Sequence, residues 1–480
     1  MLKDLVKDVV VIGGGTSGWV AAVAAARNGA DVLLVEEGSC LGGTMTAGLV
    51  LGLCSLRHQG VKTNKKFSQQ EISYADEQVV YGIAQEFVDR MVAVGAAYGK
   101  QGKATVRVLF DPEIAKWVID QMVLEAGVNV LLCTKAYQAV MENSRVTGVR
   151  LKNGLGLMDV KAKVTIDCTG DGDIAVSAGA AYEVGRPTDN LTQPLSIYFQ
   201  IGGVNIDRTL KVMKENIDAY GSDYVEALLE ARSKGLPLTL LGFRRQMEEA
   251  LKNGDFPLPY GIKQVNPKTH FGIARPIYKN GKIRYEITSH NIDMAYYVNA
   301  IDTFQLTKAT IAMRDVAVRM AEFYRKYIPG YEDSYLLQTA SMVGVRETRR
   351  ITGDYILKYE DVIQGQTFTD AVGRNGSVID IHDIDGGEKP INLSEVGGQG
   401  WYHVPYRILL PRNIEGLLIA GRCVSSDYLA NGSIRQQAGC MVTGQAAGVA
   451  AAIAAQGGIS PREVNVEELQ KRLVLQGVLI

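Results

Sequence analysis

The chain has 480 residues, more than one ordinary hydrophobic core holds, which predicts at least two domains. An apolar content of 46% and a charged content of 21% are typical of a globular protein rather than a disordered one. The formal net charge of −1 provides no long-range attraction to nucleic acid or to an anionic membrane, so we expect neither as a partner.

The N-terminal apolar run is cut short by glycines and lacks the features of a secretory signal, which favours a cytoplasmic location. The six cysteines are scattered without a C-x-x-C pair, so we expect buried thiols rather than a disulfide framework. They are Cys40, Cys54, Cys133, Cys168, Cys423 and Cys440.

The strongest motif lies within the first fifty residues. Residues 9–12 predict a buried strand, residues 13–18 fit G-x-G-x-x-G, and an alanine-rich helix pattern follows. A second apolar strand over residues 32–35 ends at Glu36. Strand, glycines, helix, strand and acidic residue occur in the order of a dinucleotide-binding unit, so an ordinary glycine-rich turn is a poor alternative.

Each part of this unit has a role toward a dinucleotide. Gly13 allows the tight turn, Gly15 lets the backbone approach a pyrophosphate, and Gly18 lets helix and strand pack closely. The helix N-terminus offers N–H groups to the pyrophosphate, and Glu36 can accept hydrogen bonds from ribose hydroxyls. The candidate contacts here are Gly13, Gly15, Thr16, Ser17, Gly18, Glu36 and Glu37.

Residues 41–48 read Leu-Gly-Gly-Thr-Met-Thr-Ala-Gly, and here the chain resembles a family. It is similar to the FAD-dependent oxidoreductases related to the fumarate reductase flavoprotein, within the glutathione reductase-like superfamily. The resemblance implies a Gly-Gly turn against the FAD pyrophosphate and ribityl chain, which favours FAD over NAD. The implied contacts are Gly42, Gly43, Thr44 and Met45.

We therefore expect an α/β fold: a Rossmann-like FAD-binding domain with a three-layer parallel sheet, and an inserted α+β cap domain on the substrate side. The FAD-binding domain is predicted over residues 1–190 and 400–480, and the cap over residues 191–399. Within the cap, residues 195–201 alternate as an antiparallel strand does, and residues 301–327 predict a long helix.

In the FAD-binding part, residues 128–133 and 146–152 predict strands joined by a polar hairpin at residues 142–144. The resemblance places the chain after the first of these strands across the adenine, which makes Ala136 a candidate. Asp111 and a following proline predict the start of an earlier helix.

Another buried strand, residues 164–168, precedes a glycine- and aspartate-rich turn. The resemblance implies that the turn's backbone lies against FAD, with Thr169, Gly170 and Asp171 as candidates. The alternative for Asp171 is that it caps a helix over residues 174–180.

Near the C-terminus, strand residues 417–420 lead into Gly421 and Arg422, which the resemblance implies as FAD contacts. Residues 408–410 predict a preceding strand. A helix starting near residue 437 includes Gly439, and its N-terminus could stabilise reduced flavin. The alternatives are a packed core helix without flavin contact and, less favoured because of its polar and small residues, a membrane helix.

No second strand–GxGxxG–helix unit is present in the sequence, so a built-in NAD(P)H domain is not expected. The pattern favours hydride transfer between flavin N5 and a small polar or acidic substrate. An external electron carrier and a homo-oligomer are left open as partners. Two other functions stay open: an FAD-binding redox sensor, and a thiol-using flavoenzyme working through Cys423 or Cys440.

Side chains that could handle a proton or bind a carboxylate complete the hypothesis. An ion-pair network with Glu347 and neighbouring acids is the alternative role for the arginines within residues 345–350, and a surface loop is the alternative to a lid for residues 56–73. An acidic stretch at residues 380–387 lacks EF-hand spacing, so no metal is expected. The catalytic candidates are His382, His403, Tyr406, Arg346 and Arg407, with Arg350 and Arg435 as further arginines.

Overall fold

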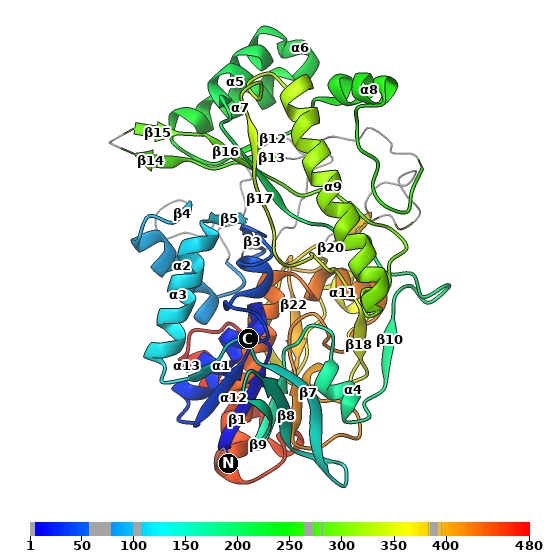
Figure 1. Ribbon diagram of the computed structural model, residues 1–480. Coiled ribbons are helices and arrows are strands. Elements are labelled where there is room, and N and C mark those ends of the chain that lie inside the picture. The colour runs from blue at the N-terminus through cyan, green and yellow to red at the C-terminus, as the bar shows by residue number, and fades with distance from the viewer. Residues whose placement is uncertain are drawn as a thin grey trace.

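The computed structural model describes residues 5–56, 78–98, 107–263, 272–279, 282–382, 384, 392–394 and 396–480. Figure 1 shows two parts, a lower one around a parallel sheet and an upper one around an antiparallel sheet. This arrangement confirms the predicted α/β, Rossmann-like fold. Apart from its first residue, Leu56, the segment predicted as a loop or lid lies outside the described residues.

The lower sheet places parallel strands in the order β6-β2-β1-β9, with β23 parallel to β9 on its other side. The apolar, β-branched runs of β1, β2, β23 and the second half of β9 are buried on both faces, as central parallel strands require, whereas β6 lies at the edge and is partly exposed. The bounds are β1 Leu5–Ile12, β2 Val32–Val35, β6 Asn129–Leu131, β9 Gly156–Asp167 and β23 Leu417–Ile419.

Alternate residues of these strands enter two different buried clusters, which gives the predicted three layers. Val9 and Val11 pack toward helices α1 (Thr16–Arg27) and α12 (Gln437–Gly457). Val10 and Ile12 pack toward a hairpin of β7 (Lys135–Glu142) and β8 (Arg145–Asn153), together with α4 (Asp173–Ser177). The parallel strands therefore have helices on one face and the β7–β8 hairpin on the other, and that hairpin continues the same sheet because β8 pairs antiparallel with the first half of β9.

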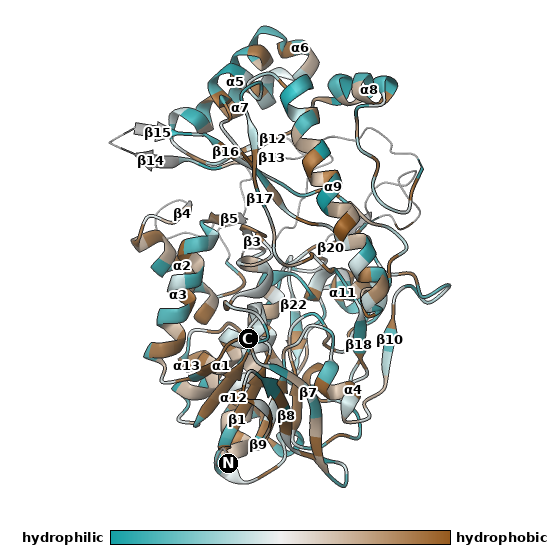
Figure 2. Cartoon of the chain, in the orientation of Figure 1, coloured by the Kyte–Doolittle hydropathy of each residue, from teal (hydrophilic) through white to brown (hydrophobic). Residues whose placement is uncertain are grey.

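Helices α1 and α12, from opposite ends of the chain, pack against each other through small residues. A Cβ atom on Gly444 would lie 2.3 Å from the Ser17 carbonyl oxygen, and one on Gly448 would lie 2.2 Å from the Ala21 carbonyl oxygen. Helix α12 is, among the described residues, the helix long and apolar enough to cross a membrane, but 94% of its apolar window is buried. Figure 2 shows it within the brown, apolar lower part.

The predicted hairpin is present, but it joins different strands. Its turn around Asn143 connects β7 to β8, whereas β6 pairs with β2 in the parallel sheet. The prediction omitted β7 because its residues are half exposed and its apolar alternation is weak. The sequence reading of residues 128–133 as the hairpin partner was therefore wrong.

The upper part is built on an antiparallel sheet in the order β12-β13-β16-β11-β17. Its buried cluster includes Leu195, Ala340 and, from the N-terminal region, Leu49 and Leu51. The strand expected over residues 195–201 is confirmed only in its second half, β11. Helix α9 (Thr303–Tyr327) confirms the predicted long helix. The remaining strands are β12 Leu238–Leu240, β13 Gly272–Ala274, β16 Ile287–His290, β17 Tyr335–Thr339 and β11 Phe199–Gly202.

Helices α5 to α8 flank this upper sheet in Figure 1, and a small hairpin of β14 and β15 extends from it. Residues 357–381 return to the buried cluster of the lower part. The domain boundaries at residues 190 and 400 stay a prediction. The bounds are α5 Ile206–Glu215, α6 Ile217–Tyr220, α7 Ser222–Ser233, α8 Arg244–Asn253, β14 Ile277–Lys279 and β15 Lys282–Arg284.

The other elements complete the lower part. The strand predicted over residues 408–410 is instead a 3-10 helix, η2 (Tyr406–Leu409), whose apolar residues fill the core without strand pairing. Helix α3 starts as predicted, with the Asp111 carboxylate accepting from the Glu113 N–H group. The bounds are η1 Gly43–Met45, β3 Gly52–Cys54, α2 Ile83–Ala93, β4 Ala97–Tyr98, β5 Arg107–Phe110, α3 Pro112–Glu125, β10 Tyr182–Val184, β18 Arg349–Ile351, α10 Tyr359–Gln364, β19 Ala371–Asn375, β20 Ile379–Ile381, β21 Asn392–Ser394, β22 Tyr402–Pro405, α11 Tyr428–Ile434, η3 Pro461–Glu463 and α13 Val466–Leu475.

Candidate functional site

The glycine turn between β1 and α1 contains two glycines that protein atoms crowd and one that lies beside open space. Gly13 has φ +90°, and a Cβ atom on it would lie 2.6 Å from the Cys168 carbonyl oxygen. A Cβ atom on Gly18 would lie 1.7 Å from the Gly13 carbonyl oxygen. A Cβ atom on Gly15 would meet nothing within 4 Å. The space beside Gly15 is therefore open to a ligand.

The first turn of α1 also suits a pyrophosphate. Gly15 is the N-cap residue and has no side chain to cap the first N–H groups of the helix. The Gly42-Gly43 turn lies against it: Gly42 N–H donates to the Gly14 carbonyl oxygen at 2.8 Å, and the Thr16 and Thr44 hydroxyls are 3.5 Å apart. Both backbone turns predicted for one dinucleotide are thus adjacent.

Glu36 lies at the end of β2, where the predicted ribose contact requires it. Its carboxylate accepts from the Gly14 and Gly38 N–H groups, each at 2.6 Å. The Thr134 N–H group donates to the Glu36 carbonyl oxygen at 3.0 Å, which brings the segment leading to buried Ala136 beside it. This position fits the adenosine end of FAD.

Two other cofactor candidates differ in exposure. Glu37 is an exposed residue that pairs with Lys135 at 3.2 Å. Met45 is fully buried at the end of η1. Met45 therefore shapes the turn from inside the core, whereas Glu37 lies on the surface next to Glu36.

The carboxylate that organises α4 is Asp167, which the sequence reading did not select. It accepts from the N–H groups of Ile174 and Ala175, both at 2.9 Å, and from the Thr169 hydroxyl at 2.7 Å. The alternative in which Asp171 caps this helix was therefore wrong. An aspartate at the end of a buried apolar strand was the available signal.

Asp171 instead pairs with Arg422. The Arg422 guanidinium donates to Asp171 at 2.6 Å and to the Val345 carbonyl oxygen at 2.7 Å, and the Thr348 hydroxyl donates to Asp171 at 2.5 Å. A Cβ atom on Gly170 would lie 2.9 Å from the Arg422 guanidinium. Arg422 thus connects the turn after β9 to the segment around residue 345.

Gly421, which has φ +89°, and Gly439 both lie in tight surroundings near the start of α12. The Gly421 N–H group donates to the Thr443 hydroxyl at 3.0 Å, and a Cβ atom on Gly421 would lie 2.5 Å from the Ser17 hydroxyl oxygen. A Cβ atom on Gly439 would lie 2.4 Å from the Ile434 carbonyl oxygen. Both positions require glycine for packing, whatever they contact in FAD.

Beside this helix start, the structure assembles a largely buried charged cluster, defined here as Asp293, Arg346, Asp380, His382 and Arg435. Arg346 pairs with Asp293 at 2.8 Å, and His382 Nδ1 lies 2.9 Å from Asp293. His382 Nε2 lies 3.4 Å from Asp380, and Arg435 lies 3.8 Å from Asp380. The predicted candidates His382 and Arg346 are therefore brought together, with two carboxylates that the prediction did not name as site residues.

Electrostatics within the charged cluster favour the cation of His382 and the anion of Asp380. Burial and the charge of Arg346 oppose the His382 cation, but Asp293 and Asp380 outweigh them and raise the pKa of His382. Burial likewise opposes ionisation of Asp380, yet hydrogen bonding and charge from His382, with Arg435, hold the pKa of Asp380 below its usual range. The carboxylates of Asp293 and Asp380 and the imidazolium of His382 between them therefore stabilise one another.

The other catalytic candidates contact different partners. His403 accepts from the Phe368 N–H group at 3.1 Å, and burial lowers the pKa of His403, so it is neutral near pH 7. The Tyr406 hydroxyl donates to the Pro461 carbonyl oxygen at 2.8 Å. The structure does not bring either of them to the charged cluster.

The remaining arginines support the ion-pair alternative. Arg407 donates to Asp370 at 2.8 Å, and its side chain is 46% exposed, so it does not join the charged cluster. Arg350 pairs with Glu347 at 3.2 Å, and both side chains are almost fully buried. These arginines are held by carboxylates of the chain itself.

The two cysteines of the thiol alternative are buried. Burial raises the pKa of Cys440 to about 12 and that of Cys423 well above its ordinary value, so both are neutral thiols near pH 7. This protonation disfavours a thiolate mechanism. No group of side chains suited to a metal ion occurs among the described residues.

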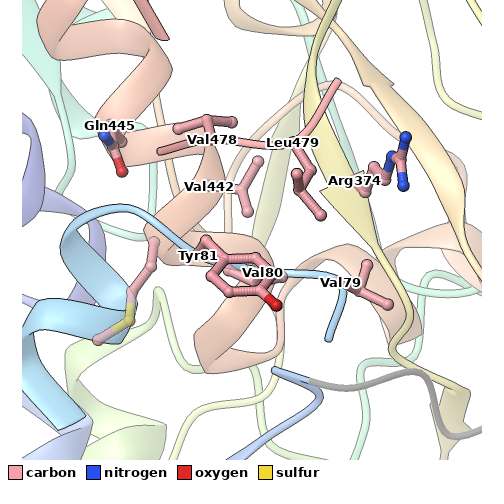
Figure 3. A pocket seen from close by; sticks show the side chains of 9 residues that line it. Val79, Val80, Tyr81, Arg374, Val442, Gln445, Val478 and Leu479 are labelled. Atoms are coloured by element: carbon pink, nitrogen blue, oxygen red, sulfur yellow. The ribbon is translucent and has the colours of Figure 1, made fainter. Parts of the chain in front are cut away.

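A small pocket away from the charged cluster is lined in part by residues of α12. Figure 3 shows Tyr81, Val442 and Leu479 around it, with Arg374 at one side. Its free volume of about 10 Å³ has room for roughly one water molecule. None of its lining residues belongs to the charged cluster, so we do not assign the substrate to it.

Comparisons with curated proteins give partial matches. The chain is 31% identical over 169 residues to digeranylgeranylglycerophospholipid reductase 2 of Methanopyrus kandleri, a match covering 34% of this chain and 37% of that protein. It is 27% identical over 165 residues to digeranylgeranylglycerophospholipid reductase of Thermoplasma acidophilum, covering 34% of this chain and 39% of that protein. The chain thus matches well under half the length of these relatives.

Comparison with solved structures gives weaker likenesses. A geranylgeranyl bacteriochlorophyll reductase-like protein from Thermoplasma acidophilum is 14% identical, with a TM-score of 0.44 over 98% of this chain and 83% of that chain. A myxobacterial FAD-dependent chondrochloren halogenase is 12% identical, with a TM-score of 0.43 over 98% of this chain and 78% of that chain.

The match to a family covers nearly the whole sequence. The family described as FAD dependent oxidoreductase matches residues 8–473. The open glycine turn, the adjacent Gly-Gly turn and the placement of Glu36 agree with its cofactor. The chain therefore belongs to the FAD dependent oxidoreductase family, and its cofactor is FAD.

Proposed function

We propose that the protein transfers a hydride between FAD and a small polar or acidic substrate held at the charged cluster. Bound FAD supplies the redox chemistry, while the chain must hold the substrate and manage one proton. The carrying observation is that Arg346, His382 and Arg435 meet around two carboxylates, which leaves one surplus positive charge when His382 is protonated. That surplus favours an anion.

Unpaired donors beside the charged cluster support a ligand with acceptor oxygens. Gln193 Nε2 and Arg435 Nε are buried and have no hydrogen-bond partner among the described residues. The two side chains touch, with Arg435 Nη2 donating to Gln193 Oε1 at 3.3 Å. A buried unpaired donor costs about 1–3 kcal/mol, so a ligand that accepts from both would gain that energy.

Electron exchange is proposed to run directly between FAD and the substrate or an external carrier, since the sequence holds no second GxGxxG unit. A closer relation to the fumarate reductase flavoproteins is part of this proposal. The reductases matched above are named for a digeranylgeranyl lipid. The charged cluster favours a compact acidic substrate over such a long apolar chain for this protein.

The test is anaerobic flavin spectroscopy of the FAD-loaded protein. Small hydroxy acids are added to oxidised flavin, and small unsaturated acids are added to dithionite-reduced flavin. We expect one of these acids to change the flavin absorbance band, and Arg435→Gln to slow that change at least about tenfold because it removes a cationic donor. Arg232→Gln is the matched control, since Arg232 pairs with Asp207 at 2.8 Å in the upper part.

Three outcomes would contradict the proposal. Failure of every tested acid to alter either flavin state would remove the substrate class. Equal effects of Arg435→Gln and Arg232→Gln would remove the charged cluster from substrate binding. Flavin reduction that requires a partner protein would favour the redox-sensor alternative.

A further inference from the structure

The His382 ring lies between two carboxylates, Asp293 and Asp380, and its contact with Asp293 joins the two parts of the molecule. His382 follows β20 in the lower part, whereas Asp293 follows β16 of the upper sheet. The Nδ1 atom lies 2.9 Å from Asp293 Oδ2, and the Nε2 atom lies 3.4 Å from Asp380 Oδ1. An ionised carboxylate only accepts hydrogen bonds, so Nδ1 carries the proton that faces Asp293, and the Asp380 carboxylate within ion-pair distance of Nε2 favours a second proton there. The geometry therefore favours the imidazolium form.

The groups that face this imidazole come from several segments. Asp293 and Asp380 favour its cation, and Arg346, paired with Asp293, opposes it. Arg435 lies on the other side of Asp380. The backbone N–H group of His382 donates to Gln193 Oε1 at 3.2 Å, which holds the backbone in place. The carboxylates prevail, because the pKa of His382 is raised although the ring is buried.

The two ring nitrogens are held unequally. Asp293 is 20% exposed and lies within hydrogen-bond distance of Nδ1. Asp380 is 31% exposed, and its contact with Nε2 is longer. Asp380 is also shared with Arg435, whose guanidinium lies 3.8 Å away. The Nδ1 proton is thus fixed, while the Nε2 proton is the one that can leave.

We infer that Asp293 is a positioning residue that keeps His382 as an imidazolium, with the Nδ1 proton fixed and the Nε2 proton available to the substrate. When the proton leaves, the Nε2–H bond breaks and the proton joins the acceptor atom of the substrate. The imidazole stays neutral with Nδ1–H bonded to Asp293, and a hydronium ion from the solvent then restores the Nε2 proton and becomes water. The inference rests on the proposed function, since it supplies that reaction's proton.

The experiment is an NMR titration of the FAD-loaded protein carrying ¹³Cε1-labelled histidine. The chain has five histidines, and the His382→Gln variant assigns the signal. We expect the wild-type His382 signal to titrate above the ordinary histidine value. Asp293→Asn should lower that midpoint by about one pH unit, because it removes a carboxylate and leaves the Arg346 charge.

Controls separate positioning from general damage. Asp293→Glu should restore the raised midpoint, and Asp255→Asn, which removes an upper-part carboxylate paired with Lys326, should leave it unchanged. The His403 signal should titrate below the ordinary value in every variant. FAD content and thermal midpoint check folding, and Asp380→Asn provides a second variant, expected to lower the midpoint as well.

A wild-type His382 signal that titrates at or below the ordinary histidine value would overturn the inference, and so would a midpoint that Asp293→Asn does not move. The titration needs no substrate. Its result is therefore distinguishable from a failure of the flavin assay, which tests the proposed function.

Discussion

The Gly15→Ala substitution is expected to weaken FAD binding on the order of 100-fold, about 2.7 kcal/mol, while the fold stays intact. The added Cβ atom would meet no protein atom within 4 Å, and Gly15 has φ −65° and ψ −169°, which alanine adopts without strain. The methyl group would instead occupy the space that the pyrophosphate needs beside the helix N-terminus. Titration of the apoprotein with FAD, followed by flavin fluorescence, measures the loss.

The matched control is Gly154→Ala in the turn between β8 and β9. A Cβ atom there also meets nothing within 4 Å, and the turn lies outside the glycine motif. Wild-type affinity in Gly15→Ala would show that the open space is not the cofactor site, and a drop in the thermal midpoint of its apoprotein would show that the added methyl group disturbs the fold.

The Gly444→Ala substitution is expected to destabilise the protein by about 2–4 kcal/mol. Its Cβ atom would lie 2.3 Å from the Ser17 carbonyl oxygen, a backbone atom that moves only if α1 moves. Ser17 belongs to the first turn of α1, so the displacement should also lower FAD affinity. Urea unfolding measures the first effect, and FAD titration measures the second.

The control for this packing prediction lies on the same helix. Gly457→Ala adds a Cβ atom at ordinary contact distance, 3.5 Å, from Ile459. It should leave the free energy of unfolding unchanged or raise it by up to about 1 kcal/mol, because alanine is the better helix former. Equal stability of the two variants would contradict close α1–α12 packing as the reason for Gly444.

The N-terminal nucleotide unit could be predicted because its signals are consecutive in the chain. The roles of Gly13 and Gly18 follow from residues that touch each other across one turn. The role of Asp167 was missed because a helix cap is sought directly before the helix, whereas this carboxylate reaches it from the end of β9. The spacing of residues along the sequence does not reveal this contact between Asp167 and the start of α4.

The charged cluster could be predicted only in part. His382 and Arg346 were selected by residue type, but so were Tyr406 and Arg407, which bind other partners. Asp293 lay in a segment with no motif, and only the pairing of distant strands brings it to His382. Convergence of side chains from separate segments depends on tertiary structure, which one sequence does not display.

Strand β9 pairs with β1 from the beginning of the chain and with β23 from near its end, and α12 covers α1. A ribosome releases the glycine turn long before residues 417–457 emerge, whereas the upper part can gather its core from one nearly continuous stretch. The FAD-binding part therefore stays incomplete until β23 and α12 have been synthesised. We therefore expect a chain truncated before β23 to yield protein that does not retain FAD, which flavin absorbance of the purified protein would measure.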